Sequence, residues 1–408
     1  MQLPPSAAGR PCLRTDQLPP AVRAALRARA GGSEPVSGYL YDPAVAVERA
    51  GALRAALPDW ARVCYAVKAN SHPPLVSALG TQVDGFEVAS AAEAALARRV
   101  RPDGLLVAAG PAKTEALLTA LVSAGVDVVN VESPLELHRL QAVAARAGRR
   151  VDVALRVNPD VVTVTGALAM GGAATAFGVA EADVPAVLAL AATLPDLRVV
   201  GFHVHAVGNN LDAAAHAGYV RWCLDWSART AAAHRIELRT VDVGGGLGVP
   251  FDGGAGFDLD RFGALLAGLT PPAGCRTVLE PGRWLVTDAG WYAAEVVDVK
   301  HTHGTWFVVL RGGINHFALP VSWDIPHRFA VLPVDDWPHP YPRPQVDDAP
   351  VTVVGELCTS EDTLARDVTV SRVRAGDLVV FPMAGSYGWE FALPHFLGHP
   401  PADRWLLG

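Results

Sequence analysis

Between Arg62 and Trp284, short apolar runs alternate regularly with Ala- and Leu-rich stretches of helical length. The runs favour strands and are apolar along their whole length, which is typical of strands buried on both faces of a parallel sheet covered by helices. Counting from YAVK gives about eight β–α units, the number that closes a TIM barrel. An open doubly wound sheet is the alternative, because the pattern does not show closure. The expected strands are 63–68, 84–90, 105–110, 126–133, 151–158, 199–205, 240–246 and 277–282.

The chain on either side of this region has a different pattern. Residues 1–37 are rich in proline, glycine and alanine and are expected to form an arm that joins a second domain. The barrel is assigned to residues 38–283. Residues 284–408 show strands joined by turns and little helix, which predicts a β-rich domain whose final segment returns to the active site. The proline-crowded stretch from Pro326 to Pro350 is interpreted as a loop on the surface of that domain.

Charge and cysteine content exclude several classes of function. Lysine and arginine number 34 and aspartate and glutamate 41, for a net charge of −7, so neither a nucleic-acid nor a membrane partner is expected. The five cysteines include no CxxC pair, which argues against a disulfide framework or a metal site. With no secretory signal and no long apolar stretch, a cytoplasmic location is expected.

The polar residues that could carry chemistry follow the ends of the predicted strands, where barrel enzymes have their active sites. These residues are Lys68, Glu87, Arg156, His205, Gly244–Gly246, Glu280 and Arg283. Each has a structural alternative: a solvated lysine, a tight glycine turn, or an ion pair at the barrel rim. Together, a lysine for an aldehyde, glycines for a phosphate and a carboxylate for a pyridine nitrogen describe a pyridoxal phosphate site.

Seven motifs occur in the order found in the fold-type III pyridoxal phosphate decarboxylases, and this chain resembles that group from about residue 38 to residue 400. The group includes diaminopimelate, ornithine and arginine decarboxylases and is related in fold to alanine racemase. The motifs are YAVKAN (65–70), GFEVAS (85–90), RVNP (156–159), VGGG (243–246), EPGR (280–283), GELCTSEDTL (355–364) and GSYG (385–388).

The resemblance implies a role for each matching residue. Lys68 holds the cofactor aldehyde, Glu280 pairs with the pyridine nitrogen and His205 stacks on the ring. The remaining cofactor contacts are Glu87, Arg156, Gly244, Gly245, Gly246, Gly282, Arg283 and Tyr387. Cys358 comes from the partner subunit of a head-to-tail homodimer and protonates the α-carbon after carbon dioxide leaves.

Three positions depart from the group's pattern. Gly208 stands where a phosphate-binding serine is usual, and Ala176 where diaminopimelate enzymes have a lysine. Thr359 replaces the acid that contacts the distal amine of a diamino acid, which argues against a substrate with a free distal ammonium, since that cation would be desolvated without a partner.

The motifs GALAMGG (166–172), FHVHAVGNNLD (202–212) and the Cys358–Thr359 pair resemble a siderophore-biosynthesis branch of the group. That branch decarboxylates a citryl conjugate of 2,3-diaminopropionate during staphyloferrin B assembly. Candidate substrate contacts are Thr359, Asp362 and Arg311, with His316 beside Arg311 in LRGGINH.

The function expected is therefore decarboxylation of an amino acid or amino-acid conjugate by a pyridoxal phosphate enzyme, with a citryl-diaminopropionate type of substrate. The alternatives are a diaminopimelate or other basic amino-acid decarboxylase, an amino-acid racemase on the same fold, and a non-catalytic pyridoxal phosphate carrier. A racemase would need an acid–base tyrosine on the opposite face of the cofactor, and Cys358 in GELC argues against it.

Overall fold

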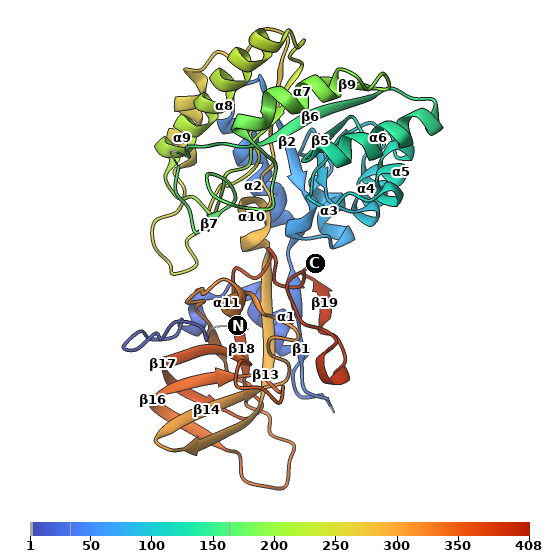
Figure 1. The fold of residues 1–408 in the computed structure, drawn as a ribbon. Helices are drawn as coiled ribbons and strands as arrows, with labels where there is room; N and C mark the ends of the chain where they lie inside the picture. The colour runs from blue at the N-terminus through green and yellow to red at the C-terminus, as the bar shows by residue number, and fades with distance from the viewer. Residues whose placement is uncertain (1–2, 33, 163) are drawn as a thin grey trace. The chain divides into compact units, whose positions relative to one another are not determined.

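The computed structural model describes residues 3–32, 34–162 and 164–408, which form two compact units (Figure 1). One unit, the barrel unit, comprises Val47–Pro250 and Ala255–Leu285. The other, the β-unit, comprises Met1–Ala46, Phe251–Gly254 and Val286–Gly408. Within the described residues, no helix is both long and apolar enough to cross a membrane.

The barrel unit is a ring of parallel strands. Its members are β2 (Ala61–Ala66), β3 (Gly85–Val88), β4 (Leu105–Ala108), β5 (Val128–Val131), β6 (Val151–Asn158), β9 (Leu197–His203), β11 (Thr240–Asp242) and β12 (Arg276–Leu279). The ring closes because β5 pairs with β6 and β12 pairs with β2. The predicted TIM barrel is confirmed, and closure rules out the open doubly wound sheet.

Helices alternate with the strands of this ring, beginning with one that precedes β2 in sequence. They are α2 (Pro43–Ala56), α3 (Pro73–Leu79), α4 (Ala91–Val100), α5 (Glu115–Ser123), α6 (Pro134–Ala147), α7 (Val184–Ala191), α8 (Ala213–His234), α9 (Leu259–Ala267) and α10 (Arg283–Val286). Several begin at a side chain that accepts a backbone N–H, such as Ser90 before α4, Ser133 before α6 and Asp212 before α8. These caps satisfy donors that the first helical turn leaves unpaired.

The long connection between β6 and β9 has structure of its own. It carries β7 (Leu168–Ala169), β8 (Val179–Ala180) and α7. β7 pairs antiparallel with β10 (Val207–Gly208), and β8 pairs parallel with the end of β6. The glycine-rich part of the connection is therefore tied to the segment that follows β9, where His205 lies.

The β-unit contains a mixed sheet in which most neighbouring strands are antiparallel. Its strands are β1 (Ser37–Tyr41), β13 (Gly290–Thr302), β14 (Thr305–Leu310), β15 (Ala330–Leu332), β16 (Gln345–Val354), β17 (Thr363–Arg374), β18 (Leu378–Phe381) and β19 (Asp403–Leu406). β1 pairs with β13, although residue 38 is where the barrel begins in the sequence interpretation. β17 was not among the strands expected from the sequence. The core of the unit includes Leu40, Trp291 and Val380.

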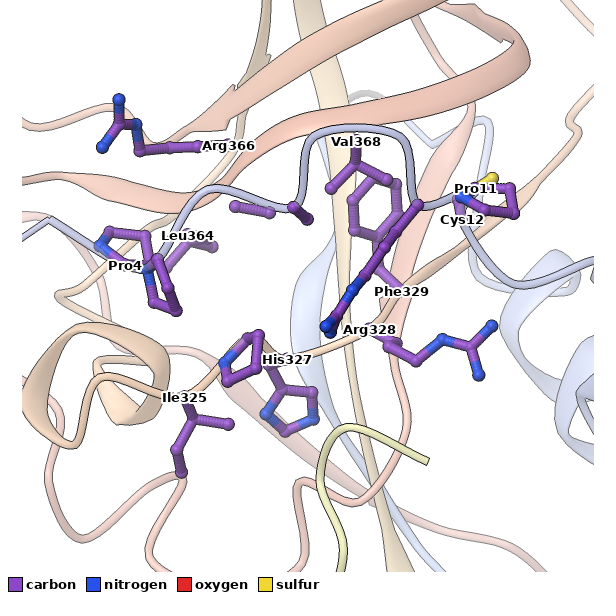
Figure 2. Close-up of a pocket in the computed structure, with 15 residues that line it drawn as sticks. Pro4, Pro11, Cys12, Ile325, His327, Arg328, Phe329, Leu364, Arg366 and Val368 are labelled. Atoms are coloured by element: carbon purple, nitrogen blue, oxygen red, sulfur yellow. The ribbon is translucent and has the colours of Figure 1, made fainter. Parts of the chain in front are cut away.

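The arm before β1 adds to this unit. Its helix α1 (Pro20–Arg27) buries Val22 and Leu26 in the same core. Further upstream, the arm makes isolated bridges to β17 and β15. A small pocket lies beneath it, lined by Ile325 and His327 on one side and by β17 on the other (Figure 2). None of the site residues predicted from the sequence lines this pocket.

The proline-crowded loop is ordered by its aromatic residues. Trp337 Nε1 donates to the carbonyl of Tyr341 at 2.9 Å, and the Arg343 guanidinium lies 5.3 Å from the Trp337 ring. Arg343 also pairs with buried Asp377 at 3.2 Å. A cation–π contact and an ion pair therefore attach the loop to the sheet.

Candidate active site

Lys68 lies in a 3₁₀ turn, Val67–Ala69, directly after β2. Its Nζ is 2.5 Å from Oε2 of Glu87, which ends β3 and is fully buried. Burial raises the pKa of Glu87 to about 7, although the Lys68 ammonium opposes that rise. The pair thus places an amine and a readily protonated carboxyl side by side at the carboxyl ends of neighbouring strands.

Glu280 follows β12 and belongs to a buried group with His203 and Asp242. Oε2 of Glu280 is 3.6 Å from Nε2 of His203, and one ligand atom from each of the three residues lies within 4.8 Å of the others. Burial raises the pKa of Asp242 well above its usual value, and the neighbouring Glu280 adds to that shift. For Glu280, burial is outweighed by His203 and Lys68, so its pKa falls below its usual range.

The two carboxyls therefore divide their roles. The opposite shifts favour the charge on Glu280 and the proton on Asp242, since two carboxylates this close and this buried resist ionising together. Sequence reasoning assigned a role to His205 but missed His203 and Asp242. The signal for both was present, because His203 is the first histidine of FHVH and Asp242 directly precedes VGGG.

His205 lies just after β9, against the triple-glycine loop. Its Nδ1 accepts the backbone N–H of Gly245 at 3.2 Å. Burial, together with the positive charges of Arg156 and Lys68, holds the pKa of His205 well below its usual value, so the ring is neutral. A Cβ on Gly244 would collide with the His205 ring, and a Cβ on Gly245 would collide with the carbonyl oxygen of Glu280. Close approach therefore requires glycine at both positions.

The glycine loop rests on a polar pair that the sequence reasoning also missed. The backbone N–H of Asn210 donates to the carbonyl of Gly246 at 2.8 Å. Its side-chain Nδ2 is 3.2 Å from Nδ1 of His216, a buried residue of α8. An amide nitrogen only donates, so Nδ1 of His216 accepts. Asn210 belongs to the NNLD segment, which sequence reasoning used only for its resemblance.

Arg156 is buried near the end of β6. Its Nη1 is 2.9 Å from Oε1 of Glu132, and its guanidinium lies 4.6 Å from the ring of Phe177. Phe177 follows Ala176, the position where diaminopimelate enzymes have a lysine. The arginine is therefore held by a carboxylate on one strand end and an aromatic ring of the long connection.

The EPGR segment packs against the turn that carries Lys68. A Cβ on Gly282 would lie 2.8 Å from the Cβ of Ala69, and the backbone N–H of Ala66 donates to the carbonyl of Pro281 at 3.3 Å. Arg283 is buried and begins α10. The barrel unit thus carries Lys68, Glu87, Arg156, His205, Gly244–Gly246, Glu280, Gly282 and Arg283 at the carboxyl ends of its strands.

The remaining predicted site residues belong to the β-unit. Cys358 has an exposed, free thiol in the segment that follows β16. The hydroxyl of Thr359 accepts the backbone N–H of Glu361 at 3.3 Å. Tyr387 lies in a left-handed backbone conformation (φ 58°), and its ring is 5.0 Å from that of Trp323.

The other three candidate substrate contacts are occupied by protein groups. Asp362 is buried and accepts two backbone N–H groups. Arg311 forms an ion pair with Glu356. His316 is buried between the hydroxyl of Ser37 and the carbonyl of Pro400, at 2.8 Å from each.

The barrel residues fit pyridoxal phosphate by their unpaired atoms as well as by their identity. Oε1 of Glu280 and Oε1 of Glu87 are buried without a hydrogen-bond partner among the residues described. Buried carboxylate oxygens of this kind need a donor, and a protonated ring nitrogen supplies one. The glycine loop has no side chains that would obstruct a phosphate, although the backbone N–H groups of Gly244 and Gly245 already donate to Asp242 and His205.

The chain is similar to known pyridoxal-dependent enzymes. A family model described as "Pyridoxal-dependent decarboxylase, pyridoxal binding domain" matches residues 45–287. The chain is 35% identical over 372 residues to "2-[(L-alanin-3-ylcarbamoyl)methyl]-2-hydroxybutanedioate decarboxylase" of Staphylococcus aureus, covering 90% of this chain and 93% of that protein. It is 31% identical to a "Diaminopimelate decarboxylase" of Zymomonas mobilis, covering 87% of this chain and 83% of that protein.

The chain also resembles solved structures of enzymes from this group. Diaminopimelate decarboxylase from Helicobacter pylori, complexed with L-lysine, aligns with a TM-score of 0.79 and 25% identity. The alignment covers 93% of this chain and 92% of that one.

Proposed function

The chain belongs to the pyridoxal-dependent decarboxylases, and on that premise we propose that its substrate is an amino-acid conjugate whose side-chain nitrogen is already acylated. The observation that carries this proposal is the set of side chains around Cys358. Thr359 offers a hydroxyl where an acid would neutralise a distal ammonium, and Glu356 and Asp362 are bound by protein groups. An acylated nitrogen carries no charge and needs no carboxylate partner.

The name of the S. aureus relative describes a substrate of this kind. It specifies a hydroxybutanedioate joined through a carbamoylmethyl group to C3 of alanine, which is citrate linked by an amide to 2,3-diaminopropionate. We propose a citryl-diaminopropionate type of conjugate, in siderophore biosynthesis, for this chain. The second candidate is a diamino acid such as diaminopimelate, because relatives with that name are about as long and 30–31% identical.

The barrel residues supply a consistent set of roles. Bound pyridoxal phosphate provides the electron sink for the pair released when the α-carboxyl group leaves. Lys68 would hold the cofactor aldehyde, and the loop Gly244–Gly246 would lie against its phosphate. Glu280 would accept a hydrogen bond from the protonated ring nitrogen, and its lowered pKa suits that role because an ionised carboxyl stabilises the pyridinium.

His205 and Cys358 complete the proposed assignment. Neutral His205 would lie against the cofactor ring, its Nδ1 fixed by Gly245. The Cys358 thiol would donate a proton to the α-carbon after carbon dioxide leaves. Tyr387 and Arg283 would contribute further phosphate contacts.

We further propose that two copies of the chain share their active sites and that the enzyme works in the cytoplasm on a small molecule. The exposed Cys358 thiol supports a shared site, because a proton donor in a solvent-excluded reaction needs a covering surface. A racemase would invert the α-carbon without releasing carbon dioxide. A non-catalytic carrier would neither invert the α-carbon nor release carbon dioxide.

The test is carbon dioxide release by the purified protein loaded with pyridoxal phosphate. The substrates compared are citryl-diaminopropionate, meso-diaminopimelate, ornithine and lysine. Release from the conjugate alone supports the proposal. Release from a free diamino acid overturns the substrate class, and inversion without release would indicate a racemase.

A matched variant tests the role assigned to Thr359. Thr359→Glu restores an acid at that position and is expected to lower kcat/KM for the conjugate and raise it for diaminopimelate. Thr359→Val keeps the size of threonine and adds no charge. It should therefore not raise turnover of diaminopimelate.

A further inference from the structure

Asp362 connects the segment that carries Cys358 to a second, neighbouring turn. One carboxylate oxygen accepts the backbone N–H of Ile314 and the other accepts that of Leu357, each at 2.7 Å. Asp362 is only 2% exposed. Leu357 directly precedes Cys358, and Ile314 lies in the 311–315 turn after β14. One buried side chain therefore bridges two backbone segments.

Two glycines make room for this bridge. A Cβ on Gly313 or on Gly355 would collide with the Asp362 carboxylate, and a Cβ on Gly355 would also meet the Cα of Gly313. The two backbones approach so closely that only glycine fits at either position. Gly313 of LRGGIN and Gly355 of GELC therefore both leave room for the Asp362 carboxylate.

The segment between Leu357 and Asp362 is folded on itself. The backbone N–H of Thr359 donates to the carbonyl of Leu357 at 2.8 Å, and that of Asp362 donates to the carbonyl of Thr359 at 3.2 Å. A third bond runs from the N–H of Gly355 to the carbonyl of Asp362 at 3.0 Å. Cys358 and Ser360 are the exposed residues of this closed turn.

Glu356 adds a second bridge between the same two segments. It pairs with Arg311, and it accepts from Nδ2 of Asn315 at 3.2 Å. His399 Nδ1 lies 3.7 Å from the same carboxylate oxygen. The Cys358 turn is therefore anchored by a half-buried ion pair at Glu356 and by the buried carboxylate of Asp362.

We infer that Asp362 is a positioning residue that fixes the Cys358 turn by bridging Leu357 to Ile314, and not a substrate contact. This inference rests on the proposed role of Cys358 as proton donor. Both oxygens of Asp362 are committed to backbone donors in a buried place, which leaves a substrate little access to them. Loss of either acceptor would leave a buried N–H unpaired and free the turn to move.

The test compares Asp362→Asn with Asp377→Asn in the holoenzyme. Asp377 is a suitable control, because it is equally buried in the same unit and accepts the N–H groups of Val334 and Arg374, yet makes no contact with the Cys358 turn. Gly355→Ala serves as an independent variant that keeps both carboxylates and crowds the bridge.

Three readouts are expected to move together in Asp362→Asn and in Gly355→Ala. Hydrogen exchange at the Leu357 and Ile314 amides should accelerate about tenfold or more, as expected for loss of a hydrogen bond to a charged acceptor. Alkylation of Cys358 by iodoacetamide, located by peptide mapping, should speed up several-fold. The kcat should fall about tenfold or more with KM within about threefold, because the proton donor is misplaced while binding is kept.

The outcomes separate this inference from the proposed function. Unchanged amide exchange and alkylation in both variants would overturn the bridge, and a KM effect without a kcat effect would restore Asp362 as a substrate contact. The same changes in Asp377→Asn would show general destabilisation and would also overturn it. If no substrate is turned over by the parent enzyme, the proposed function fails, yet exchange and alkylation still decide the bridge.

Discussion

Glu132 accepts a hydrogen bond from Arg156 at 2.9 Å, and both side chains are buried. The same carboxylate accepts the backbone N–H of Gly110 at 2.8 Å and that of Gly178 at 3.1 Å. Glu132 therefore joins the ends of β4 and β5 to β6 and to the long connection. Burial opposes ionisation of Glu132, but Arg156 and Lys113 outweigh it and lower the pKa of the carboxyl.

Replacing Glu132 with glutamine should destabilise the barrel unit markedly. The change keeps the shape but leaves the buried Arg156 charge without its partner, which typically costs about 3–5 kcal/mol. Urea unfolding measures the loss. Glu115→Gln is the matched control, because the Glu115–Arg146 pair has the same 2.8–2.9 Å geometry at an exposed site. It should cost under about 1 kcal/mol. Equal effects of the two substitutions would contradict the role assigned to Glu132.

Acid should weaken the support of the glycine loop through His216. Burial lowers the pKa of His216 to about 4, although its bond to the Gly245 backbone opposes that shift. A histidine that binds its proton less readily when folded contributes stability above pH 6.5, and that contribution is lost as the pH falls from 6.5 towards 4. The free energy of unfolding should therefore decrease across that window.

The measurement is the pH dependence of unfolding in the protein and in His216→Gln. The variant should have a flatter profile between pH 6.5 and 4, by on the order of 2–3 kcal/mol. His327 has a pKa lowered to about 4 as well and titrates in both proteins, so the difference between the two profiles isolates His216. Parallel profiles would refute the assignment.

A methyl group on Gly245 should abolish cofactor binding, while one on Gly218 should not. The Cβ of Gly245→Ala would collide with the Glu280 carbonyl and displace the loop that faces the phosphate. Gly218 lies within α8 with nothing within 4 Å of its Cβ position, so Gly218→Ala should be neutral or stabilise by about 0.5–1 kcal/mol. Pyridoxal phosphate affinity, measured by absorbance titration, should fall about 100-fold or more in Gly245→Ala alone. Full affinity in that variant would show that the loop does not bind phosphate.

The barrel could be predicted from the sequence because its strands are local and periodic. Runs such as 151–158 are apolar throughout, and only burial on both faces explains that pattern. Strand ends then place Lys68, Glu87 and Glu280 at one rim. The β-unit was harder to predict, because β1 pairs with β13, about 250 residues away along the chain.

A motif predicts the role of a site residue only when that residue is part of the motif. Asp242, His203 and His216 act through contacts between distant segments, and no spacing along the chain shows that Asp242 and Glu280 lie side by side in the fold. Asp362 shows the converse difficulty. Its place in the GELCTSED motif suggested a substrate contact, whereas its two backbone hydrogen bonds require the folded proximity of the 311–315 turn.

A shared site predicts that two inactive variants restore each other. Lys68→Ala removes the cofactor lysine of the barrel unit, and Cys358→Ala removes the proton donor of the β-unit; each alone should have little activity. The two variants are co-expressed, each with its own affinity tag. Purification through both tags in turn leaves only mixed dimers. If Cys358 serves the partner's barrel, one of the two sites in each mixed dimer has both residues, and about half of the parental specific activity should return.

The control pair is Lys68→Ala with Glu280→Ala. Both residues lie on the barrel unit, so every site of that mixed dimer lacks one of them and no activity should return. Recovery in the first pair and none in the second would establish that the site combines the barrel of one copy with the β-unit of the other. Failure of the first pair, with the mixed dimer intact, would mean that each chain uses its own Cys358 or none.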